Sequence, residues 1–457
     1  MIAPARTAAL AALRAIASGR LDSGTALDRV QRTLGDPRDR ALAAEIVLGT
    51  LRWRAALDAV IERVSSRPLG ALDPIVLELL RASAYQVLYL TRTPAHAVVD
   101  DAVSLARESG AGRAAGLVNA VLRRIGAIGG WRSAGLPERP RDGAPREEAL
   151  AYLSTTLSHP DWLASRWLDR LGFDRAEAWA AFDNEPAPLV LRVNTRRIGT
   201  ADLLENLAGH GVVVEPAAHA PDGVVVRTGQ PLATPLAAQG LFTVQDEASQ
   251  LVGSLMAGLP GATWLDVCAA PGLKTAAASG AGAGDRPLIV AADKRPRRVA
   301  LLRRTLASLA VPAHVVRLDA LEPLPFSRTF DVVVVDAPCS GLGTLRRDPE
   351  VRWRRTAADL VRFAATQKRL LERAATTVTA GGYLVYATCT GEPEENDDVI
   401  EAFLARGSSF RPIDPREVCR ALPDGVRRFI DADGRFRTLP PRDGLEAFFA
   451  TVLTRHT

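Results

Sequence analysis

Residues 331–353 read DVVVVDAPCSGLGTLRRDPEVRW, and this stretch decides the fold of the C-terminal half. Four consecutive valines indicate a strand buried on both faces, and the polar residues Asp336 and Cys339 follow at its carboxyl end. Stretches with helical periodicity separate it from similar apolar runs; they cover 295–310, 357–379 and 394–405. Alternating strands and helices predict a parallel sheet covered by helices on both faces. In such sheets, ligands bind beyond the carboxyl ends of the strands.

The other apolar runs have the length of strands and are bounded by Gly, Pro or Asp. They are TWLDVCAA (263–270), PLIVAAD (287–293), HVVRLDA (314–320), GGYLVYATC (381–389) and EAFFATVLT (446–454). The polar residues with chemical potential lie at the ends of these runs. We therefore expect a single site along one edge of the sheet.

The chain is too long for one ordinary domain, and its patterns change along its length. Residues 1–126 carry apolar residues at three- and four-residue intervals, which predicts an all-α bundle. Residues 127–148 are rich in Gly, Pro and Arg without periodicity, and we interpret them as a linker. Residues 149–245 combine two predicted helices with short β-rich runs, which predicts a small α/β subdomain. Residues 246–457 carry the alternating strands and helices.

Hydrophobic residues make up 47% of the 457 residues, enough for real cores, and a 24% charged fraction argues against disorder. The net charge of +5 is compatible with nucleic acid as a partner. The four cysteines form no CxxC pair and the six histidines are scattered, so we expect neither a disulfide framework nor a metal site. Apolar runs are shorter than the ~18 residues of a membrane span, and arginines interrupt the N-terminal helix. We expect a cytoplasmic monomer.

The segment DVCAAPGLKT (266–275) follows the first strand of the alternating region and opens a helix. Its small residues allow a ligand close to the backbone, and a helix N-terminus offers free N–H groups. GxGxxG and GxxxxGK[ST] are both absent, which disfavours a dinucleotide or a triphosphate. Asp293 and Asp319 end the next two strands, where carboxylates can meet a ribose and an adenine edge, although acidic residues also end strands as ordinary turn formers. A nucleoside without a phosphate cradle fits S-adenosylmethionine (SAM) best.

Three segments resemble the signature segments of the Sun (Fmu) family of RNA cytosine-5 methyltransferases: CAAPGLKT (268–275), DAPCSGLGTLRRDPEVRW (336–353) and YATCTGEPEEN (386–396). VQDEASQL (244–251) is similar to the lead-in to the family's first strand. The N-terminal segments DRALAAEIVLGTLRW, PAHAVVDDAVSLA and GLVNAVLRR resemble its NusB-like RNA-binding domain. The resemblance covers nearly the whole chain and is closest to members that modify 16S rRNA. It implies a NusB-like bundle, a small α/β RNA-binding subdomain and a Rossmann-like methyltransferase domain, with SAM as cofactor and RNA as partner.

The resemblance also assigns roles to residues. Cytosine C5 is a poor nucleophile until a thiolate adds at C6, so the reaction needs a nucleophile and a group that assists release. By resemblance Cys389 is the nucleophile, Cys339 assists release and Asp336 holds the N3/N4 edge of the base. Cofactor contacts are expected from the residues Cys268, Ala269, Ala270, Pro271, Gly272, Leu273, Lys274, Asp293, Asp319 and Asp336.

Two features bear on cofactor and RNA binding. Lys274 is one of only three lysines among 57 basic residues, so its place in the cofactor loop suggests a role that arginine cannot fill. Arginines near an active-site mouth suit phosphates, and an aromatic side chain can stack on a base. The residues expected to contact RNA are Arg346, Arg347, Arg352, Trp353, Arg123 and Arg124. The alternative interpretation is that Trp353 packs in the core and the arginines form a solvated face.

The chain departs from the family at Leu273, where the loop usually has a second glycine. A leucine at a position that needs positive φ would weaken cofactor binding. This departure is the only support for a rival reading, a NusB-like RNA-binding or antitermination factor whose catalytic half has decayed. A second rival, a DNA cytosine methyltransferase, is opposed by the Thr-Cys pair at 388–389 and by the N-terminal bundle.

Overall fold

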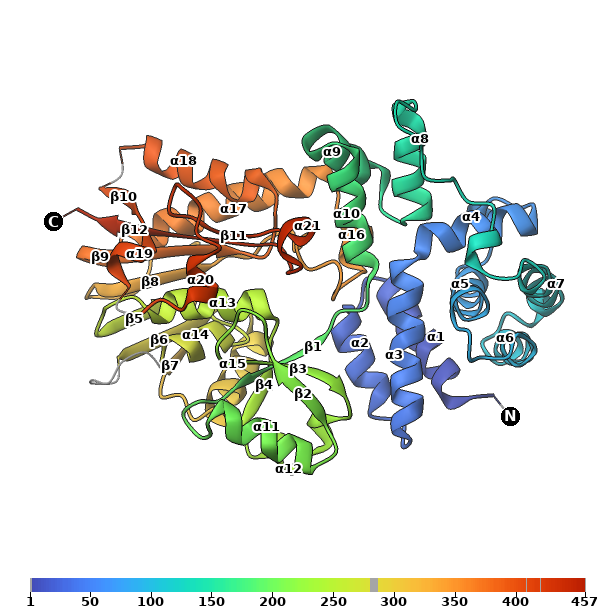
Figure 1. Ribbon diagram of the computed structural model, residues 1–457, viewed down its shortest axis with the longest axis horizontal. Coiled ribbons are helices and arrows are strands. Elements are labelled where there is room, and N and C mark those ends of the chain that lie inside the picture. The colour runs from blue at the N-terminus through green and yellow to red at the C-terminus, as the bar shows by residue number, and fades with distance from the viewer. Residues whose placement is uncertain (1, 280–286, 408, 420, 457) are drawn as a thin grey trace. The chain divides into compact units, whose positions relative to one another are not determined.

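The computed structural model describes residues 2–456 except 280–286, 408 and 420 (Figure 1). The chain divides into two units. The N-terminal unit contains Met1–Pro186 and Leu345–Arg355, and the C-terminal unit contains Ala187–Thr344 and Thr356–Thr457. The boundary at residue 186 falls inside the segment 149–245, so its helices up to residue 184 belong to the N-terminal unit, whereas its strands and the helix at 200–209 belong to the C-terminal unit.

The N-terminal unit begins with an all-α bundle, as the periodicity predicted. Its helices are α1 (Pro4–Ala17), α2 (Ser23–Gln31), α3 (Pro37–Arg52), α4 (Arg54–Ser65), α5 (Pro74–Tyr89), α6 (Ala95–Glu108) and α7 (Ala115–Gly126), with 3-10 turns at Leu69–Ala71 and Gly112–Ala114. Aspartates 22, 36 and 73 cap α2, α3 and α5 by accepting hydrogen bonds from backbone N–H groups. The apolar faces meet in a core that includes Leu57, Leu79 and Leu122.

The interpreted linker, 127–148, is folded back on this bundle. A 3-10 turn covers Trp131–Ser133, and Ala134 directly after it is fully buried in the bundle core. The helices α8 (Arg146–Ala151), α9 (Asp161–Leu171) and α10 (Phe173–Asn184) follow, with a π-helical turn at Tyr152–Thr156. The short helix α16 (Val351–Arg354) belongs to the same unit although it follows the Pro-Cys segment in sequence.

The C-terminal unit starts with a small antiparallel sheet in the order β2-β3-β1-β4. Its elements are β1 (Leu189–Val193), α11 (Thr200–Gly209), β2 (Val213–Pro216), β3 (Gly223–Thr228), a 3-10 turn at Pro231–Ala233, α12 (Pro235–Ala238) and β4 (Phe242–Val244). The predicted helix at 200–209 and the predicted β-rich runs are thus both present.

The large sheet has the order β10-β12-β9-β8-β5-β6-β7, with β11 paired to β12. Strands β5 to β9 run parallel, whereas β12 is antiparallel to β9 and β10. The expectation of a purely parallel sheet was therefore wrong at this end, because the last strand enters the sheet from β10 and β11 without a crossover helix. The strands are β5 (Thr263–Asp266), β6 (Leu288–Asp293), β7 (His314–Arg317), β8 (Phe330–Asp336), β9 (Val378–Thr388), β10 (Phe410–Ile413), β11 (Phe436–Thr438) and β12 (Phe448–Arg455).

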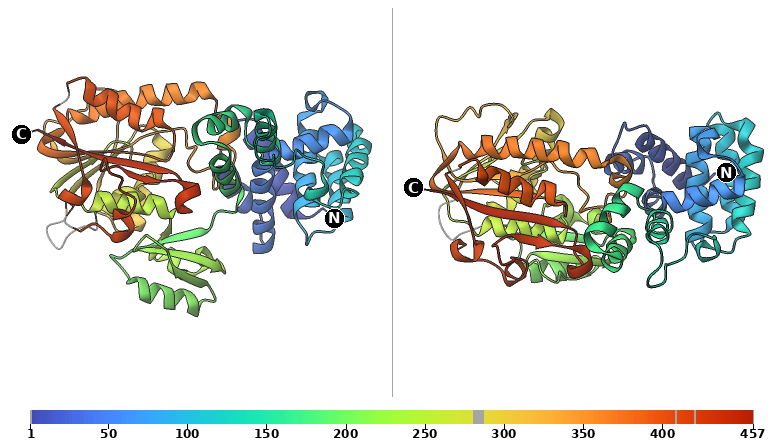
Figure 2. Two further views of the ribbon diagram at one scale, coloured as in Figure 1. Left: turned by 45° about the horizontal axis from the view of Figure 1, so that its top comes forward. Right: turned by 90° about the horizontal axis from the view of Figure 1, so that it is seen from above.

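Helices cover both faces of this sheet, as Figure 2 shows. One face packs on α13 (Glu247–Ala257), α14 (Leu273–Ala278) and α15 (Pro296–Ser308), and the other on α17 (Ala357–Ala375) and α18 (Asp397–Ala405). Short helical turns complete the unit at Pro393–Glu395, α19 (Pro415–Val418), α20 (Asp424–Arg427) and α21 (Pro440–Asp443). The valines of β8 alternate between the two cores, which accounts for a strand without a polar face.

Candidate active site

The register of the parallel strands gathers the predicted site at one edge of the large sheet. Asp266 pairs with Ala291 of β6 and with Val334 of β8, two residues before Asp336. Asp336 in turn pairs with Ala387 of β9, two residues before Cys389. The cofactor loop and both cysteine segments therefore leave the sheet at adjacent strand ends.

The cofactor loop is held by Asp266 and turns at a glycine. The Asp266 carboxylate accepts hydrogen bonds from Cys268 N at 3.2 Å and Thr275 Oγ1 at 2.7 Å. Burial raises the pKa of Asp266 to about 7, against the effect of the Thr275 hydrogen bond. Gly272 has φ +107°, and a Cβ there would lie 2.8 Å from Leu302 Cδ1. Glycine is thus required at position 272 both for backbone conformation and for space.

Leu273 does not adopt the strained, positive-φ conformation that would weaken cofactor binding. Gly272 carries the positive φ, and Leu273 is the first residue of α14. Its side chain packs against the buried Leu302 and Leu306 of α15. Its carbonyl oxygen accepts a hydrogen bond from Arg192 at 3.0 Å. The replacement of the usual glycine is therefore compatible with an intact loop.

Two carboxylates lie beyond the next strands. Asp293 ends β6 and accepts hydrogen bonds from Arg295 N and Arg298 Nε, both at 3.0 Å. Asp319 lies two residues beyond β7, 2.7 Å from Lys294 Nζ. The hydrogen bond from Lys294 lowers the pKa of Asp319, which is therefore a carboxylate at neutral pH. Both side chains retain lone pairs for further donors such as hydroxyl or amino groups.

Lys274 forms an ion pair with Asp336. The distance from Lys274 Nζ to Asp336 Oδ2 is 2.7 Å, and the two side chains are 14% and 24% exposed. The ammonium also lies 5.5 Å from the ring centroid of Phe448. Burial by itself lowers the pKa of Lys274, but the neighbouring Asp336 carboxylate outweighs it and raises the pKa overall. The site thus contains a fixed positive charge.

The two predicted catalytic cysteines face each other. Cys339 Sγ and Cys389 Sγ are 3.2 Å apart, and both residues are half-buried. The hydrogen bond with Cys339 and then burial raise the pKa of Cys389 well above its ordinary value, whereas the Lys274 ammonium lowers it. In this arrangement Cys389 is a thiol. A substrate that separated the two sulfurs would remove the largest cause of the raised pKa.

Backbone contacts hold the two cysteine loops together. Gly343 N donates to Cys389 O at 3.1 Å, and Ala447 N donates to Gly343 O at 3.0 Å. A Cβ at position 343 would lie 2.1 Å from Ala447 O and 2.8 Å from Cys389 O, so only glycine allows this approach. The glycines after the Pro-Cys pair therefore serve the spacing of the two sulfurs.

A second link between the two cysteine loops comes from Glu395 and Asn396, for which the sequence predicted no role. The fully buried Glu395 accepts hydrogen bonds from Ser340 N at 2.8 Å and Gln367 Nε2 at 3.0 Å through one carboxylate oxygen. Asn396 accepts from Thr388 Oγ1 at 2.6 Å and donates to Thr390 O at 2.9 Å. Burial raises the pKa of Glu395. These two side chains fix the residues on either side of Cys389 and the residue after Cys339.

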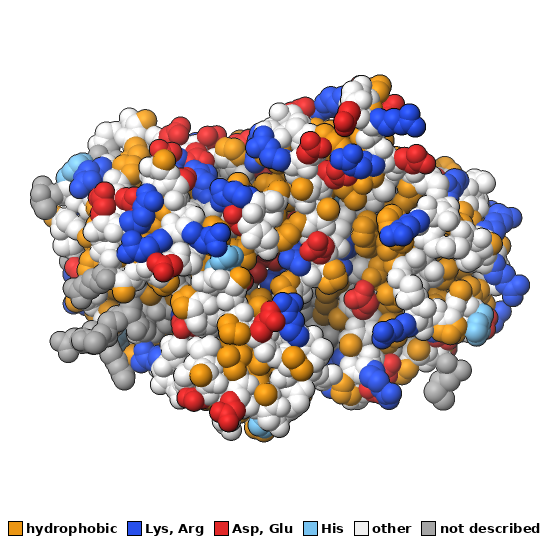
Figure 3. Space-filling model, in the orientation of Figure 1, with side chains coloured by type: hydrophobic (Ala, Val, Ile, Leu, Met, Phe, Trp, Pro, Cys, Tyr) orange, Lys and Arg blue, Asp and Glu red, His pale blue; other side chains and the backbone are white. Residues whose placement is uncertain are grey.

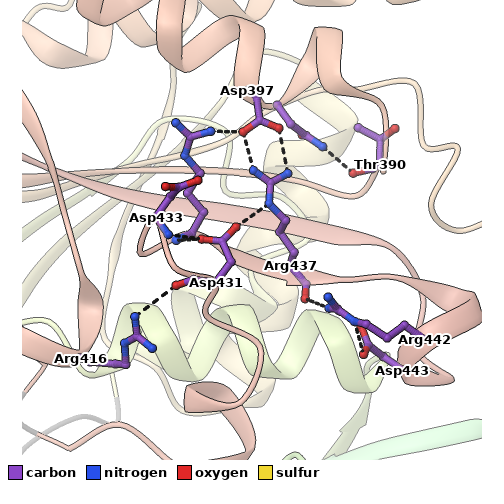
Figure 4. Close-up of polar contacts among 10 residues, drawn as sticks. Thr390, Asp397, Arg416, Asp431, Asp433, Arg437, Arg442 and Asp443 are labelled. Carbon is purple, nitrogen blue, oxygen red and sulfur yellow. Dashed lines mark hydrogen bonds and ion pairs between the residues drawn. The ribbon is translucent and has the colours of Figure 1, made fainter. Parts of the chain in front are cut away.

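Helix α18 begins directly after Asn396, and a group of ion pairs holds its first turn (Figure 4). Asp397 pairs with Arg435 and Arg437, and Arg437 Nε lies 2.8 Å from Asp431 Oδ2. Figure 4 shows this network beside the contact to Thr390 O, at the end of the helix that faces the cysteine loop. The loop after Cys389 is thus anchored to β11 and β12.

The residues expected to contact RNA differ in exposure and in their partners. Arg123 and Arg124 are exposed on α7, and Arg347 is half-buried. Arg346 is 15% exposed, pairs with Glu185 at 3.2 Å and lies 4.5 Å from the ring centroid of Phe182. On the face that Figure 3 draws, acidic and basic side chains are interspersed and form no single broad basic surface.

Arg352 and Trp353 were expected to contact RNA, but their side chains make contacts within the N-terminal unit instead. Arg352 is fully buried and donates to Ser158 O at 3.0 Å and Asn184 Oδ1 at 2.9 Å. The Trp353 indole donates to Leu51 O at 2.6 Å. Both side chains hold α16 within the N-terminal unit, because their N–H groups find carbonyl partners there. The packing alternative for Trp353 is therefore the better description.

Two negative findings apply to the described part of the chain. No group of three or more His, Cys, Asp or Glu side chains there is arranged to hold a metal ion. None of its helices combines the length and apolar character needed to cross a membrane.

Family models match three stretches of the chain. Residues 254–454 match 16S rRNA methyltransferase RsmB/F, residues 3–127 match the NusB family, and residues 159–233 match the RsmF/B-like ferredoxin-like domain. Ribosomal RNA small subunit methyltransferase B of Pseudomonas syringae pv. tomato is 35% identical over 464 residues, 98% of this chain and 96% of that protein. Its counterpart in Vibrio cholerae is 31% identical over 98% of this chain and 97% of that protein. This chain belongs to the RsmB/F methyltransferase family.

Solved structures agree with this family in fold. The crystal structure of PH0851 superposes with a TM-score of 0.80 at 23% identity and covers 99% of each chain. A methyltransferase homolog from Pyrococcus horikoshii gives 0.55 at 26% identity, covering 67% of this chain and 99% of its own. NSun6 from the same organism, solved with SFG, gives 0.57 at 18% identity, covering 65% and 98%.

The RsmB/F family is SAM-dependent, and the described residues fit that cofactor. The loop Ala269–Gly272 presents no side chain larger than proline, and Gly272 brings its backbone against α15. The carboxylates of Asp293 and Asp319 lie beyond neighbouring strands, where they can accept from hydroxyl and amino groups. Lys274 and Asp336 lie between this loop and the cysteines. The arrangement suits a nucleoside and a methionine moiety.

Proposed function

We propose that this chain transfers a methyl group from SAM to C5 of a cytosine in 16S rRNA through a covalent adduct with Cys389. The observation that carries the proposal is the approach of Cys339 Sγ and Cys389 Sγ to 3.2 Å beside the Lys274–Asp336 pair. Relatives named as small-subunit rRNA methyltransferases support the substrate class, since they match this chain from end to end. With rRNA as substrate, the protein works in the cytoplasm, as a monomer.

The cytosine ring binds with C6 at Cys389 Sγ and C5 near Cys339 Sγ, which draws the two sulfurs out of contact. Its insertion breaks the Cys339–Cys389 hydrogen bond, so the pKa of Cys389 falls and Lys274 stabilises the thiolate. Cys389 Sγ then adds to C6, and the C5–C6 π electrons become available at C5. The Asp336 carboxyl group, oriented by Lys274, holds the N3/N4 edge of the base. The target base must leave its stack to reach this depth.

SAM, when bound, supplies an electrophilic methyl group at C5. Cys339, acting as a thiolate, then accepts the C5 proton and becomes a thiol, C5=C6 re-forms, and the C6–S bond breaks to return the Cys389 thiolate. Because Gly343 and Glu395 tie the two cysteine loops together, each sulfur has a fixed position relative to the ring. The base is attacked by one thiolate and loses its C5 proton to the other.

Of the residues expected to contact RNA, only those with accessible side chains remain candidates. Arg123, Arg124 and Arg347 remain candidates for phosphate contacts, and Arg346 retains limited exposure. The rival reading, a factor with a decayed catalytic half, loses its support because Leu273 adopts an ordinary helical conformation.

The proposal is tested with purified protein, unmodified 16S rRNA and methyl-labelled SAM. We expect labelled 5-methylcytosine with the wild type, no product with Cys389→Ser, and a protein–RNA adduct that survives denaturation with Cys339→Ser. Cys419→Ser is the matched control, because Cys419 lies outside the site and contacts Leu255 O. Product from Cys389→Ser, or an adduct from Cys389→Ser rather than Cys339→Ser, would contradict the assigned roles.

A further inference from the structure

A ladder of stacked aromatic rings in the N-terminal unit ends in an exposed tryptophan. The ring centroids of Tyr85 and Tyr89 are 5.4 Å apart, and those of Tyr89 and Trp53 are 5.0 Å apart. The ring of Trp131 stacks on both Tyr89 and Trp53. Its centroid lies 6.1 Å from that of Tyr89, with an angle of 5° between the ring planes, and 6.3 Å from that of Trp53. Tyr85 is 4% exposed, whereas Trp131 is 38% exposed. The ladder is therefore buried at one end and open to solvent at the other.

The turn that carries Trp131 is held rigidly. Gly129 and Gly130 have φ of +80° and +112°, which reverse the chain before the 3-10 turn. The Arg63 guanidinium donates to Ala134 O and to Gly135 O, directly after this turn. Because the ring is already ordered, a partner that stacks on it loses little conformational entropy.

One guanidinium group lies over the exposed ring, and two more lie close to the turn that carries it or to its neighbour Arg63. Arg132 lies 5.6 Å from the Trp131 ring centroid, Arg63 binds the carbonyls after the turn, and Arg124 donates to Val64 O at 3.2 Å, beside Arg63. Within the described part of the chain, none of the three has a carboxylate partner within ion-pair distance. We call Trp131 with these three arginines the Trp131 patch. It combines a flat aromatic surface with uncompensated positive charge.

We propose that the Trp131 patch binds single-stranded RNA, with one unpaired base stacked on Trp131 and its flanking phosphates on the arginines. Stacking on an aromatic side chain tolerates any base, and neighbouring arginines track the backbone. The inference rests on the proposed function only in taking RNA as the partner. It adds a contact on the segment 127–148, which the sequence presented as a linker.

The test measures binding of a labelled single-stranded oligoribonucleotide and of unmodified 16S rRNA. Trp131→Ala is expected to weaken both at least fivefold, and Trp131→Phe to restore most of the affinity because the ring is retained. Val361→Ala is the control, since Val361 is an apolar residue that is 69% exposed in the other unit. Arg132→Gln is expected to reduce the slope of log affinity against log salt by about 0.7.

Methyl transfer to 16S rRNA is measured for the same proteins. Trp131→Ala is expected to raise KM and leave kcat unchanged, because the patch contacts RNA equally in the ground and transition states. Unchanged affinity and KM in Trp131→Ala, with an active wild type, would overturn the patch and leave the proposed function intact. Trp131-dependent binding by a wild type that transfers no methyl group would support the patch and overturn the activity. An equal loss in Trp131→Phe and Trp131→Ala would also overturn stacking.

Discussion

Replacing Lys274 by methionine is the perturbation that most directly tests the site. At 2.7 Å and an effective dielectric constant of about 20, the attraction between Lys274 and Asp336 is about 6 kcal/mol. Desolvation of the two largely buried groups offsets several kcal/mol of this. We therefore expect Lys274→Met to lower the free energy of unfolding by about 2–3 kcal/mol, measured by urea denaturation.

The same change is expected to affect catalysis through Cys389. Lys274 lowers the pKa of Cys389, so its removal raises that pKa further and moves the rise in methyl-transfer rate to higher pH. Single-turnover rates across pH, with SAM saturating, measure this shift. Lys368→Met is the matched control, because Lys368 lies on α17 outside the site. A Lys274→Met enzyme with the wild-type rate and pH profile would refute the role of the ammonium.

Three further changes test other parts of the structure. Leu273→Gly is expected to destabilise the protein by about 2 kcal/mol, from helix propensity and lost packing on α15, without a gain in SAM affinity by calorimetry. Tighter SAM binding would show that the usual glycine serves the cofactor. Burial raises the pKa of Asp183 to about 8, so the free energy of unfolding of the wild type falls as pH rises from about 4 to about 8. In Asp183→Asn, denaturation curves should show a weaker dependence of stability on pH. Parallel curves for both proteins would contradict this assignment. Glu395→Ala is expected to reduce kcat more than tenfold, whereas Glu395→Gln is expected to retain most activity because it keeps the acceptor for Ser340 N. Equal losses in the two variants would mean that the negative charge of Glu395 is needed.

The sign of the Asp183 effect follows from its surroundings. Both carboxylate oxygens lack a hydrogen-bond partner within the described residues, and the side chain is fully buried. Arg352 is nearby and lowers the pKa, but burial outweighs it. The folded protein therefore binds a proton that the unfolded chain releases near pH 4, and this contribution to stability disappears as pH passes the folded-state value.

The alternating patterns were sufficient to predict most strands of the large sheet and to place Asp293, Asp336 and Cys389 at one edge. Strand direction at the β12 end was not predictable from the same patterns. The run EAFFATVLT has the composition of a buried strand in either direction, and direction depends on whether the preceding chain crosses over a face or returns along the edge. The short strands β10 and β11 provide that return.

The sequence misled about Arg352 and gave no role to Glu395, in both cases for reasons of charge. Arg352 belongs to a run of arginines that is indistinguishable in sequence from a solvated face, yet carbonyl oxygens 158 and 183 satisfy it in the interior. Glu395 belongs to the acidic run EPEEN, which also resembles a surface segment. In both cases the partners come from distant parts of the chain.

The resting contact between the two sulfurs has a consequence for the order of events. A thiolate at Cys389 before RNA binds would be exposed to other electrophiles, SAM among them, because the cofactor loop and the cysteines share one edge of the sheet. The hydrogen bond with Cys339 opposes ionisation until a base separates the sulfurs. In the proposed mechanism, nucleophile activation is thereby coupled to substrate insertion.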